Sequence, residues 1–307
     1  MNHLTCNTRT RLSARDCFSI AVLLVIYAGR CWAESTFIVA AETQPFSGVR
    51  YLRLEKSAPD PQVAHIVQIA MNTPGLRFTT TPSNGPDAPR ETWCETTRGF
   101  VEKTGAQIGI NGNYFIYDEE LDTELIGLAV SDGNIVSPWD ASLSRFALNI
   151  TKDNKAVFVE RPEDGAGNSA TQPKTDLYSA VSSHPLLLRK GSIVVDEGGE
   201  RHPRTGIGLT ADNKLILLVV DGRQPSYSIG MTFREMAEVL LAHGAVDALA
   251  LDGGGSSTLV FADPTPHVVN VPMPTALPVD VGLKPPGIER PNGNNLAIFV
   301  SPAPTIK

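Results

Sequence analysis

Apolar and polar positions alternate with a period of two between residues 36 and 70, as they do in strands that bury one face. Three such stretches, FIVAA, VRYLRLE and VAHIVQIA, are separated by turn residues and predict an opening sheet. Residues 91–104 have a helical pattern that stops at Gly105, and the short strand AQIGI follows. The turn sequences at residues 132–134 and 153–155 are each flanked by apolar alternation, so they predict two hairpins.

A strand, a helix and a second strand follow one another between residues 214 and 260. The apolar strand KLILLVV ends at Asp221, and the helix TFREMAEVLLAHG opens with a capping box from Thr232 to Glu235. The second apolar strand, VDALAL, ends at Asp252. This order predicts a crossover unit with parallel strands, which would bring Asp221 and Asp252 to the same carboxyl edge of one sheet. Open α/β sheets bind their ligands at that edge.

Together these elements predict an α+β or mixed α/β fold, with a central mixed β-sheet that contains the parallel βαβ unit, flanking helices and additional antiparallel hairpins. With 307 residues and 42% hydrophobic composition, the chain can build a substantial core. Residues 161–176 are polar, but strand-like alternation resumes on both sides, so we interpret them as a surface loop rather than a linker. We therefore expect a single catalytic domain over residues 34–307.

The N-terminus has the features of a secretory signal peptide. Basic residues precede an apolar run at residues 18–28, and Cys31 and Ala33 supply small residues at the −3 and −1 positions of a cleavage site. The alternative is an uncleaved membrane anchor, but this run is shorter than the ~20 residues that span a bilayer. We predict that residues 1–33 are removed and that the protein is exported, to the periplasm or beyond. No later run is apolar enough to suggest stable membrane insertion.

The charge and the cysteine content of the chain exclude some classes of partner and of cross-link. The whole chain has a net charge of −7, and removal of residues 1–33 leaves 22 basic against 32 acidic residues, a net charge of −10. This balance argues against a nucleic-acid partner. Removal of the leader also leaves Cys94 as the one cysteine, which excludes an internal disulfide. We interpret Cys94 as a small buried hydrophobe rather than a nucleophile.

Three consecutive glycines, Gly253, Gly254 and Gly255, follow Asp252 at the end of an apolar strand. Glycine permits positive φ and lets a ligand approach the backbone, so successive N–H groups there could form an anion-binding nest. The hydroxyls of Ser256 and Ser257 add further donors. The segment matches neither common nucleotide-binding loop and lacks the nucleophile-elbow spacing. A phosphate or phosphodiester oxygen is the natural guest, and the alternative is a tight glycine turn between strands.

Three other stretches add polar residues at strand ends. INGNYF places Asn111 and Asn113 beside Tyr114 and Phe115, and amides with aromatic rings are suited to binding a sugar. RHPRTGIG contains His202, Arg204 and Thr205, and VDGRQ contains Asp221 and Arg223. An arginine in such a position can bind phosphate through two hydrogen bonds. Each stretch alone has an ordinary alternative, a turn or a solvated side chain, so the interpretation depends on their combination.

The motifs NGNYF, HPRTGIG, VDGRQ and DGGGSST, with the late VVNVP and ERPNGNNLAIFV, occur in an order that resembles the phosphodiester glycosidase family over roughly residues 60–300. The resemblance implies an enzyme that cleaves the C1–O bond of a sugar-1-phosphodiester, such as one of α-linked N-acetylglucosamine. It also adds Asn270 and Arg290 to the candidate substrate-binding residues, without an assigned role. The chain carries Asn113 and Tyr114 where the commoner form is NGGFF, a difference that bears on sugar preference.

A mechanism follows as a hypothesis. A phosphate monoester has a second pKa of about 6 and leaves without a strong general acid, so phosphate binding and one carboxylate could suffice. Residues 253–257 and Arg204 would hold the phosphate, and Asp252 would act at the anomeric carbon as nucleophile or as base for water. Asp221 is the second choice for that role. His202 would shuttle a proton or bind phosphate, and the two asparagines of NGNYF would orient the sugar.

Two other functions are compatible with these residues. One is a phosphodiesterase that breaks the P–O bond, and the other is a non-catalytic protein that binds envelope or exopolysaccharide glycans. Retention of two aspartates beside a phosphate nest argues against a simple binder, because carboxylates repel an anionic ligand. The sequence has no His-x-x-x-His, no paired cysteines and no calcium loop, so we expect no metal or other cofactor.

Overall fold

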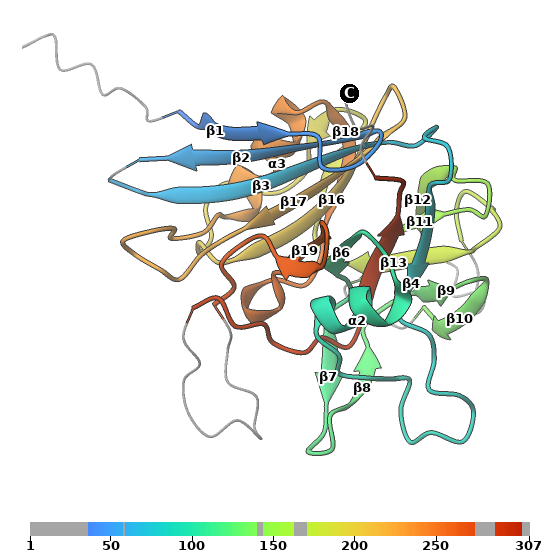
Figure 1. The fold of residues 1–307 in the computed structure, drawn as a ribbon. Helices are drawn as coiled ribbons and strands as arrows, with labels where there is room; N and C mark the ends of the chain where they lie inside the picture. Colours follow the sequence, from blue (N-terminus) through green and yellow to red (C-terminus); the bar gives the residue numbers. More distant parts are fainter. Residues whose placement is uncertain (1–35, 58, 140–143, 163–170, 274–285, 303–307) are drawn as a thin grey trace, which may run out of the picture. The chain divides into compact units, whose positions relative to one another are not determined.

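The strands of the protein form four β-sheets in a computed structural model (Figure 1). The structure describes residues 36–57, 59–139, 144–162, 171–273 and 286–302. All four sheets belong to the compact unit Phe37–Lys307. The predicted signal peptide, residues 1–33, lies outside the described residues, and so do residues 163–170 of the predicted surface loop.

The strands are ordered within the sheets as follows. The largest sheet has eight strands, β1 (Ile38–Thr43), β2 (Val49–Lys56), β3 (Gln62–Ala70), β17 (Lys214–Val220), β16 (Arg204–Thr210), β18 (Ala245–Ala250), β14 (Leu186–Arg189) and β15 (Ser192–Ile193). One five-stranded sheet contains β20 (Pro266–Val268), β19 (Leu259–Ala262), β6 (Ile108–Asn111), β21 (Asn295–Phe299) and β4 (Arg77–Thr80). The other contains β10 (Asn134–Ser137), β9 (Ala129–Ser131), β13 (Ser179–Ser183), β11 (Phe146–Ile150) and β12 (Ala156–Glu160). A three-stranded sheet contains β5 (Thr92–Trp93), β8 (Asp122–Leu125) and β7 (Phe115–Tyr117).

The predicted parallel βαβ unit is wrong, because strand β16 lies between β17 and β18 and pairs antiparallel with both. The fold is built almost wholly of antiparallel sheet, and the predicted α+β or mixed α/β class is therefore wrong as well. Helix α3 (Phe233–Ala242) connects β17 to β18 past the strand between them. The two strands still run in the same direction, so Asp221 and Asp252 follow them at one edge, one strand apart. The pattern of apolar residues indicates which positions of a strand are buried, but it does not indicate which other strand pairs with it.

The predicted helix at residues 91–104 is shorter than expected. Helix α2 spans Thr97–Thr104 and begins where the Thr96 side chain accepts a hydrogen bond from the N–H of Gly99. The residues before this cap pair with β8 as strand β5 instead. Gly105 ends α2 in the left-handed conformation, with φ of 72°, as predicted.

Both predicted hairpins are present. Strands β9 and β10 turn at Asp132 and Gly133, and strands β11 and β12 turn at Asn154, with positive φ at all three residues. The capping box of α3 is also confirmed, because the side chains of Thr232 and Glu235 each bind the other's backbone N–H. Within the described ranges, no helix is both long and apolar enough to cross a membrane.

Apolar clusters cover both faces of the eight-stranded sheet, which explains why β17 is a continuous apolar run rather than an alternating one. On one face, Val219 and Leu217 of β17 pack in a cluster with residues of both five-stranded sheets. On the other face, Leu218 and Ile216 pack in a cluster with α3. Helix α2 covers the far face of the sheet that contains β6, through Phe100.

Glycines in β16 allow close packing against α3 and β18. A Cβ at Gly206 would stand 3.0 Å from Cε of Met236 in α3, and one at Gly208 would stand 3.1 Å from Cβ of Ala245 in β18. A larger residue at position 206 would press on α3, and one at position 208 would press on β18. The glycines of HPRTGIG therefore have a packing role that holds the two aspartate-bearing strand ends in place.

Candidate active site

Asp252 follows β18 at the edge of the eight-stranded sheet where β16 begins. Its side chain is 10% exposed, and Nη2 of Arg290 donates to its Oδ2 at 3.1 Å. The hydroxyl of Ser256 donates to the same oxygen and accepts a hydrogen bond from Arg290. The three side chains thus form a closed ring of hydrogen bonds, and Arg290 acquires the role that the sequence left open.

Burial raises the pKa of the Asp252 carboxyl above its ordinary value, because desolvation disfavours the charged form. The charge of Arg290 and hydrogen bonds from Ser256 and the N–H of Gly253 oppose this shift without cancelling it. A carboxylate with a raised pKa is a better base than an exposed aspartate, and such groups gather at active sites.

Two more guanidinium groups lie near the glycine turn. Arg204, at the start of β16, donates from Nε to the carbonyl oxygen of Met231 at 3.0 Å and from Nη2 to that of Glu200 at 2.9 Å. Arg223 adopts a positive φ of 60° and places its guanidinium 3.3 Å from the point where a Cβ on Gly254 would stand. The backbone of the turn is therefore open to an arginine on this side.

Charge interactions connect these groups to Tyr114. Burial raises the pKa of Tyr114, the negative charge of Asp252 raises it further, and Arg204 lowers it. Burial also lowers the pKa of Arg204. The charge of Tyr114 acts to raise this pKa, and the charge of Arg223 lowers it further. The two arginines are thus close enough to repel each other, and a bound anion would relieve that repulsion.

The three glycines form a tight turn, with a short 3-10 helix over Gly254–Ser256. Gly254 has a φ of 61°, and a Cβ at Gly253 would stand 2.9 Å from the carbonyl oxygen of Pro203, so both positions require glycine. The N–H groups of Gly254 and of both following serines donate to carbonyl oxygens of the protein itself. Much of the expected anion-binding nest is therefore engaged within the turn, and the arginines are the stronger candidates for holding an anion.

Asn111 joins the two ends of this turn. Its amide donates to the carbonyl oxygen of Asp252 at 2.6 Å and accepts from the N–H of Thr258 at 3.2 Å. The hydroxyl of Thr205 donates to the same amide oxygen at 2.7 Å. The side chains of Asn111 and Thr205 are buried and make hydrogen bonds to protein atoms, so they support the turn from inside the protein.

Asn113 is engaged in the same way. Its amide oxygen accepts from the N–H of Ser182 and from Nδ2 of Asn294, both at 3.0 Å. Its Nδ2 donates to the hydroxyl of Ser182 at 3.1 Å and to a backbone carbonyl oxygen of residue 128 at 3.2 Å. The structure thus places this predicted sugar ligand in a buried network between sheets, 1% exposed.

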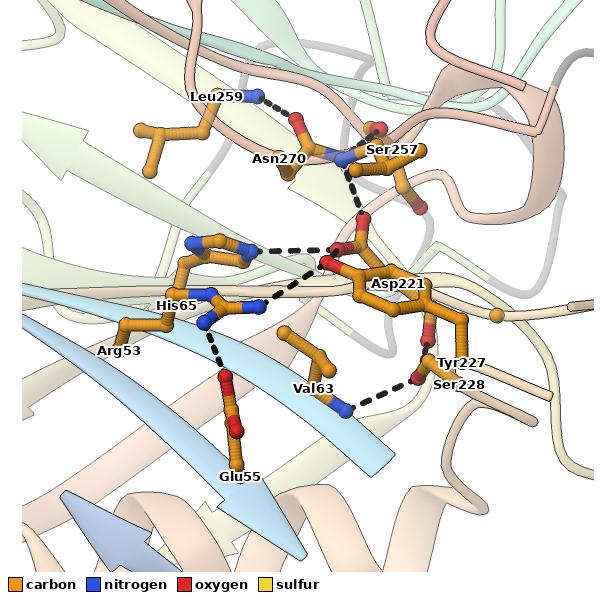
Figure 2. A network of polar contacts seen from close by, with 12 residues as sticks. Arg53, Glu55, Val63, His65, Asp221, Tyr227, Ser228, Ser257, Leu259 and Asn270 are labelled. Atoms are coloured by element: carbon orange, nitrogen blue, oxygen red, sulfur yellow. Dashed lines mark hydrogen bonds and ion pairs between the residues drawn. The ribbon is translucent and has the colours of Figure 1, made fainter. Parts of the chain in front are cut away.

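Asp221 has a carboxylate surrounded by donors (Figure 2). Its Oδ2 accepts from Nε2 of His65 at 3.2 Å and from the hydroxyl of Tyr227 at 3.0 Å. Its Oδ1 accepts from Nδ2 of Asn270 at 3.0 Å and from the N–H of Val271 at 2.8 Å. The side chain is 0% exposed, so Asp221 is a fully bonded internal carboxylate.

The pKa of Asp221 is lowered, in contrast to that of Asp252. Burial acts to raise it, but the hydrogen bond from His65, the charge of that ring when it is protonated, and the donors Asn270 and Val271 outweigh burial. A carboxylate stabilised by four donors is a weak base and a poor nucleophile. The geometry therefore favours Asp252 over Asp221 for chemistry at a substrate.

Asn270 connects Asp221 to the glycine turn through hydrogen bonds. The same Nδ2 that binds Asp221 also donates to the carbonyl oxygen of Ser257 at 3.0 Å, and its Oδ1 accepts from the N–H of Leu259 at 2.8 Å (Figure 2). Asn111 and Asn270 thus hold the turn from two sides, one through its first residue and the other through its last.

His202 lies beside Arg204 on the segment that leads into β16. Its Nε2 is 3.1 Å from Oε2 of Glu200, and its backbone pairs with Met231 across an isolated bridge. Nδ1 is buried and has no hydrogen-bond partner within the part of the chain that the structure describes. The ring is one-third exposed, so a ligand can reach this segment.

Most of the predicted site residues outside the glycine turn fall into two groups. Those that lie around Asp252 and the turn with charged, hydroxyl or aromatic groups are Tyr114, Arg204, Arg223, Ser256 and Arg290, although Arg204 and Ser256 also make hydrogen bonds inside the protein. Those whose polar atoms are bonded inside the protein are Asn111, Asn113, Thr205, Asp221 and Asn270.

Sequence reasoning missed His65 and Tyr227, which bind Asp221. The signal for His65 was a single imidazole within the apolar strand VAHIVQIA, where a polar residue requires a buried partner. No pattern identified that partner, because it lies 156 residues away. Among the described residues, no group of three or more His, Cys, Asp and Glu side chains could hold a metal ion.

Comparison with known proteins was made against families, curated proteins and solved structures. A model of the phosphodiester glycosidase family matches residues 104–299. Bovine N-acetylglucosamine-1-phosphodiester alpha-N-acetylglucosaminidase is 28% identical over 273 residues, which cover 82% of this chain and 48% of the relative. An uncharacterised prophage-derived protein of Bacillus subtilis is 44% identical over 173 residues, which cover 53% of this chain and 25% of the relative. The chain thus spans less than half the length of these curated relatives.

The fold is also similar to solved structures. The catalytic domain of zebrafish N-acetylglucosamine-1-phosphodiester alpha-N-acetylglucosaminidase, described as auto-inhibited by its pro-peptide, aligns with a TM-score of 0.61 at 21% identity. The alignment covers 86% of this chain and 87% of that domain. At this level of identity the similarity concerns the fold alone.

Proposed function

The chain belongs to the phosphodiester glycosidase family, and from this premise we propose that it hydrolyses a glycosyl phosphodiester at the bond between the sugar C1 and the phosphate oxygen. The products are a free sugar and a phosphate monoester. The observation that carries the proposal is the buried Asp252 carboxylate, bonded to Arg290 and Ser256, with Arg204 and Arg223 nearby. The first sugar to test is α-linked N-acetylglucosamine, which appears in the name of the bovine relative.

The phosphate group is proposed to bind at Arg204 and Arg223. An anion between them would relieve their mutual repulsion, and a planar guanidinium suits phosphate oxygens. Nε and Nη2 of Arg204 already bind carbonyl oxygens, so its proposed contribution is mainly its charge. His202, with its unpaired and buried Nδ1 among the described residues, is proposed as a further phosphate contact or proton carrier. Glycine at position 254 leaves room for the Arg223 guanidinium against the turn, so a phosphate bound by Arg223 would lie beside the turn that follows Asp252.

Asp252 is proposed to act at the anomeric carbon, as nucleophile or as base for a water molecule. The C1–O bond breaks with its electron pair going to the phosphate, which leaves as a monoester, and water supplies the new hydroxyl at C1. This leaving group has a second pKa of about 6, so its departure does not require a strong acid. Arg290 and Ser256 hold one carboxylate oxygen, which fixes the direction of the other.

Tyr114 is proposed to border the junction of sugar and phosphate, since it interacts with both Asp252 and Arg204. Its neighbour Phe115 lies with its ring centroid 5.5 Å from the guanidinium carbon of Arg290. Aromatic rings in these positions can stack on the apolar face of a sugar. Asn111 and Asn113 are bonded to the protein, so their proposed contribution to sugar binding is to fix this segment.

The test uses water enriched in heavy oxygen and an α-N-acetylglucosamine-1-phosphodiester, with products analysed by mass spectrometry. Label in the free sugar is the expected result and means cleavage of the C1–O bond. Label in the phosphate would mean a phosphodiesterase that breaks the P–O bond. Binding without turnover of this and related sugar phosphodiesters would favour a non-catalytic glycan-binding protein.

Export is part of the proposal. The basic residues, the apolar run at residues 18–28 and the small residues before position 34 support a leader that directs the chain out of the cytoplasm. The enzyme would then meet its substrate in the periplasm or outside the cell. A single remaining cysteine, Cys94, suits such a compartment because it offers no internal pair for oxidation.

A further inference from the structure

His65 occupies an internal position that the proposed chemistry does not use. It lies in β3 and is 1% exposed, and both of its ring nitrogens make hydrogen bonds, of which Figure 2 shows the one to Asp221. Nε2 binds Asp221 at 3.2 Å, and Nδ1 lies 2.8 Å from the hydroxyl of Tyr51. Burial raises the pKa of Tyr51 to about 12; the charge of Arg53 acts to lower this pKa, and that of Asp221 raises it further. The protonated hydroxyl can therefore donate to Nδ1, which leaves the ring proton on Nε2 to donate to Asp221.

A continuous path of hydrogen bonds leads from this ring to the glycine turn. His65 binds Oδ2 of Asp221, whose Oδ1 binds Asn270, and Asn270 binds the carbonyl oxygen of Ser257. Each link is between 3.0 and 3.2 Å. Since the side chains are buried, no solvent can replace a missing partner at low cost. The turn that carries Asp252 is thus tied at its far end to strand β3.

We propose that His65 is a positioning residue, which fixes the Asp221 carboxylate so that Asn270 holds the turn of residues 253–257 and thereby aims Asp252 at the substrate. The proposal rests on the proposed function for its kinetic consequences. It assigns Asp221 a role as an internal anchor rather than as a second catalytic carboxylate. It also gives a role to strands β2 and β3, which lie outside the matched family region at residues 104–299.

The physical reason is the cost of burying a carboxylate. Without His65, Oδ2 of Asp221 would keep one side-chain donor, Tyr227, and the charged form would lose stabilisation. A displaced Asp221 could not accept from both Asn270 and Val271 as it does now, and a protonated one would accept both hydrogen bonds more weakly because the charge is lost. Asn270 would then turn, and the carbonyl of Ser257 would lose its anchor. A shift of the turn by 1 Å can cost about 100-fold in rate.

The test compares two amides of different length at position 65. In His65→Gln the side-chain nitrogen can take the place of Nε2 and donate to Asp221, whereas in His65→Asn it falls short. Val67→Ala is the control, because Val67 is fully buried on the same face of β3, opposite Tyr51, and its truncation loosens the packing there without removing any group that makes a hydrogen bond on the path. Thermal unfolding is measured for all three, so that loss of stability can be separated from loss of positioning.

Two readouts decide the outcome. For His65→Asn we expect kcat to fall about 10- to 100-fold with KM changed less than threefold, and for His65→Gln we expect most of kcat to return. Amide hydrogen exchange over residues 252–259 should be at least tenfold faster in His65→Asn than in Val67→Ala. The proposal is overturned if His65→Asn and Val67→Ala behave alike in both measurements, or if the glutamine restores nothing.

A second variant covers the case in which His65→Asn does not fold. Tyr227→Phe removes a different hydrogen bond to Oδ2 of Asp221 while leaving His65 in place, and it should shift kcat and exchange in the same direction by a smaller amount. No change in either quantity would overturn the proposal. If the wild-type protein hydrolyses no glycosyl phosphodiester, the proposed function fails, but hydrogen exchange over the turn still decides whether His65 positions it.

Discussion

Nη2 of Arg290 lies 3.1 Å from Oδ2 of Asp252, although the two residues are 38 positions apart. This ion pair distinguishes Asp252 from Asp221, which follows β17, one strand away at the same edge of the sheet, and is held by four donors. The pKa values of the two carboxyls move in opposite directions, because burial outweighs the opposing charge of Arg290 at Asp252 and the four donors outweigh burial at Asp221. The fold thus gives the two aspartates different environments, which is why we propose Asp252 for chemistry and Asp221 for support.

Asp252→Asn should abolish turnover while leaving the fold intact. The amide cannot act as nucleophile or base, so we expect kcat to fall by about 100- to 10,000-fold or more. Asp247→Asn is the matched control, because Asp247 lies on the same strand and its carboxylate binds the backbone N–H of Lys190. Steady-state kinetics and circular dichroism check both variants. Wild-type turnover in a folded Asp252→Asn protein would transfer the catalytic role to another group.

As the pH is lowered, kcat/KM should begin to fall at a higher pH than it would if an ordinary aspartate had to be ionised. Asp252 must be ionised, and burial raises its pKa above the usual value of about 3.9. Because Arg290 lowers that pKa, Arg290→Gln should move the acid limb of kcat/KM to higher pH, and Arg290→Lys should move it less. A pH profile of the three proteins provides the measurement. Coincident acid limbs in all three would mean that another group controls the profile.

Asp221→Asn should lower stability at neutral pH. A carboxyl with a lowered folded-state pKa contributes stability above the unfolded value of about 3.9, and that stability is lost as the pH falls through the folded pKa. We expect a loss of about 3 kcal/mol at pH 7, or about 6–12 °C in Tm, which shrinks below about pH 3.5. Thermal unfolding at both pH values tests this, with exposed Asp212→Asn as a control that leaves Tm nearly unchanged. An equal Tm difference at both pH values would contradict the prediction.

Arg223→Gln should weaken the binding of inorganic phosphate as a competitive inhibitor. Loss of one charge-assisted contact corresponds to about a tenfold increase in Ki. Arg234→Gln removes the same charge from α3, where it pairs with Glu238, and should leave Ki unchanged. Inhibition kinetics at constant ionic strength separate the two variants. If both variants raise Ki equally, the effect is one of net charge and the phosphate does not bind at Arg223.

If residues 1–33 act as the proposed signal peptide, the mature protein should begin at Glu34. Signal peptidases require small residues before the cleaved bond, so Ala33→Arg should block processing and leave the full-length chain. Intact mass and N-terminal sequencing of the exported protein provide the test. Recovery of the wild-type protein with Met1 in place would argue for an uncleaved anchor.

The sequence predicted the local elements of the fold better than their arrangement. The capping box at Thr232 and the hairpin turns depend on neighbouring residues, and they were predictable because local sequence determines them. The parallel pairing of β17 with β18 was wrong because β16 inserts between them. That insertion depends on contacts between distant segments, which no periodicity records.

In the candidate site too, local sequence predicted single residues and turns, but not which distant residues pair with each other. The sequence by itself identified Asp252, its glycine turn and the arginines, because an aspartate followed by three glycines at a strand end is a local and unusual pattern. Only the tertiary structure decided that Arg290 pairs with Asp252 and that Asp221 binds His65, since both pairs join distant parts of the chain. Residue type fixes what a side chain can do, and burial with its partners decides which of two aspartates remains reactive.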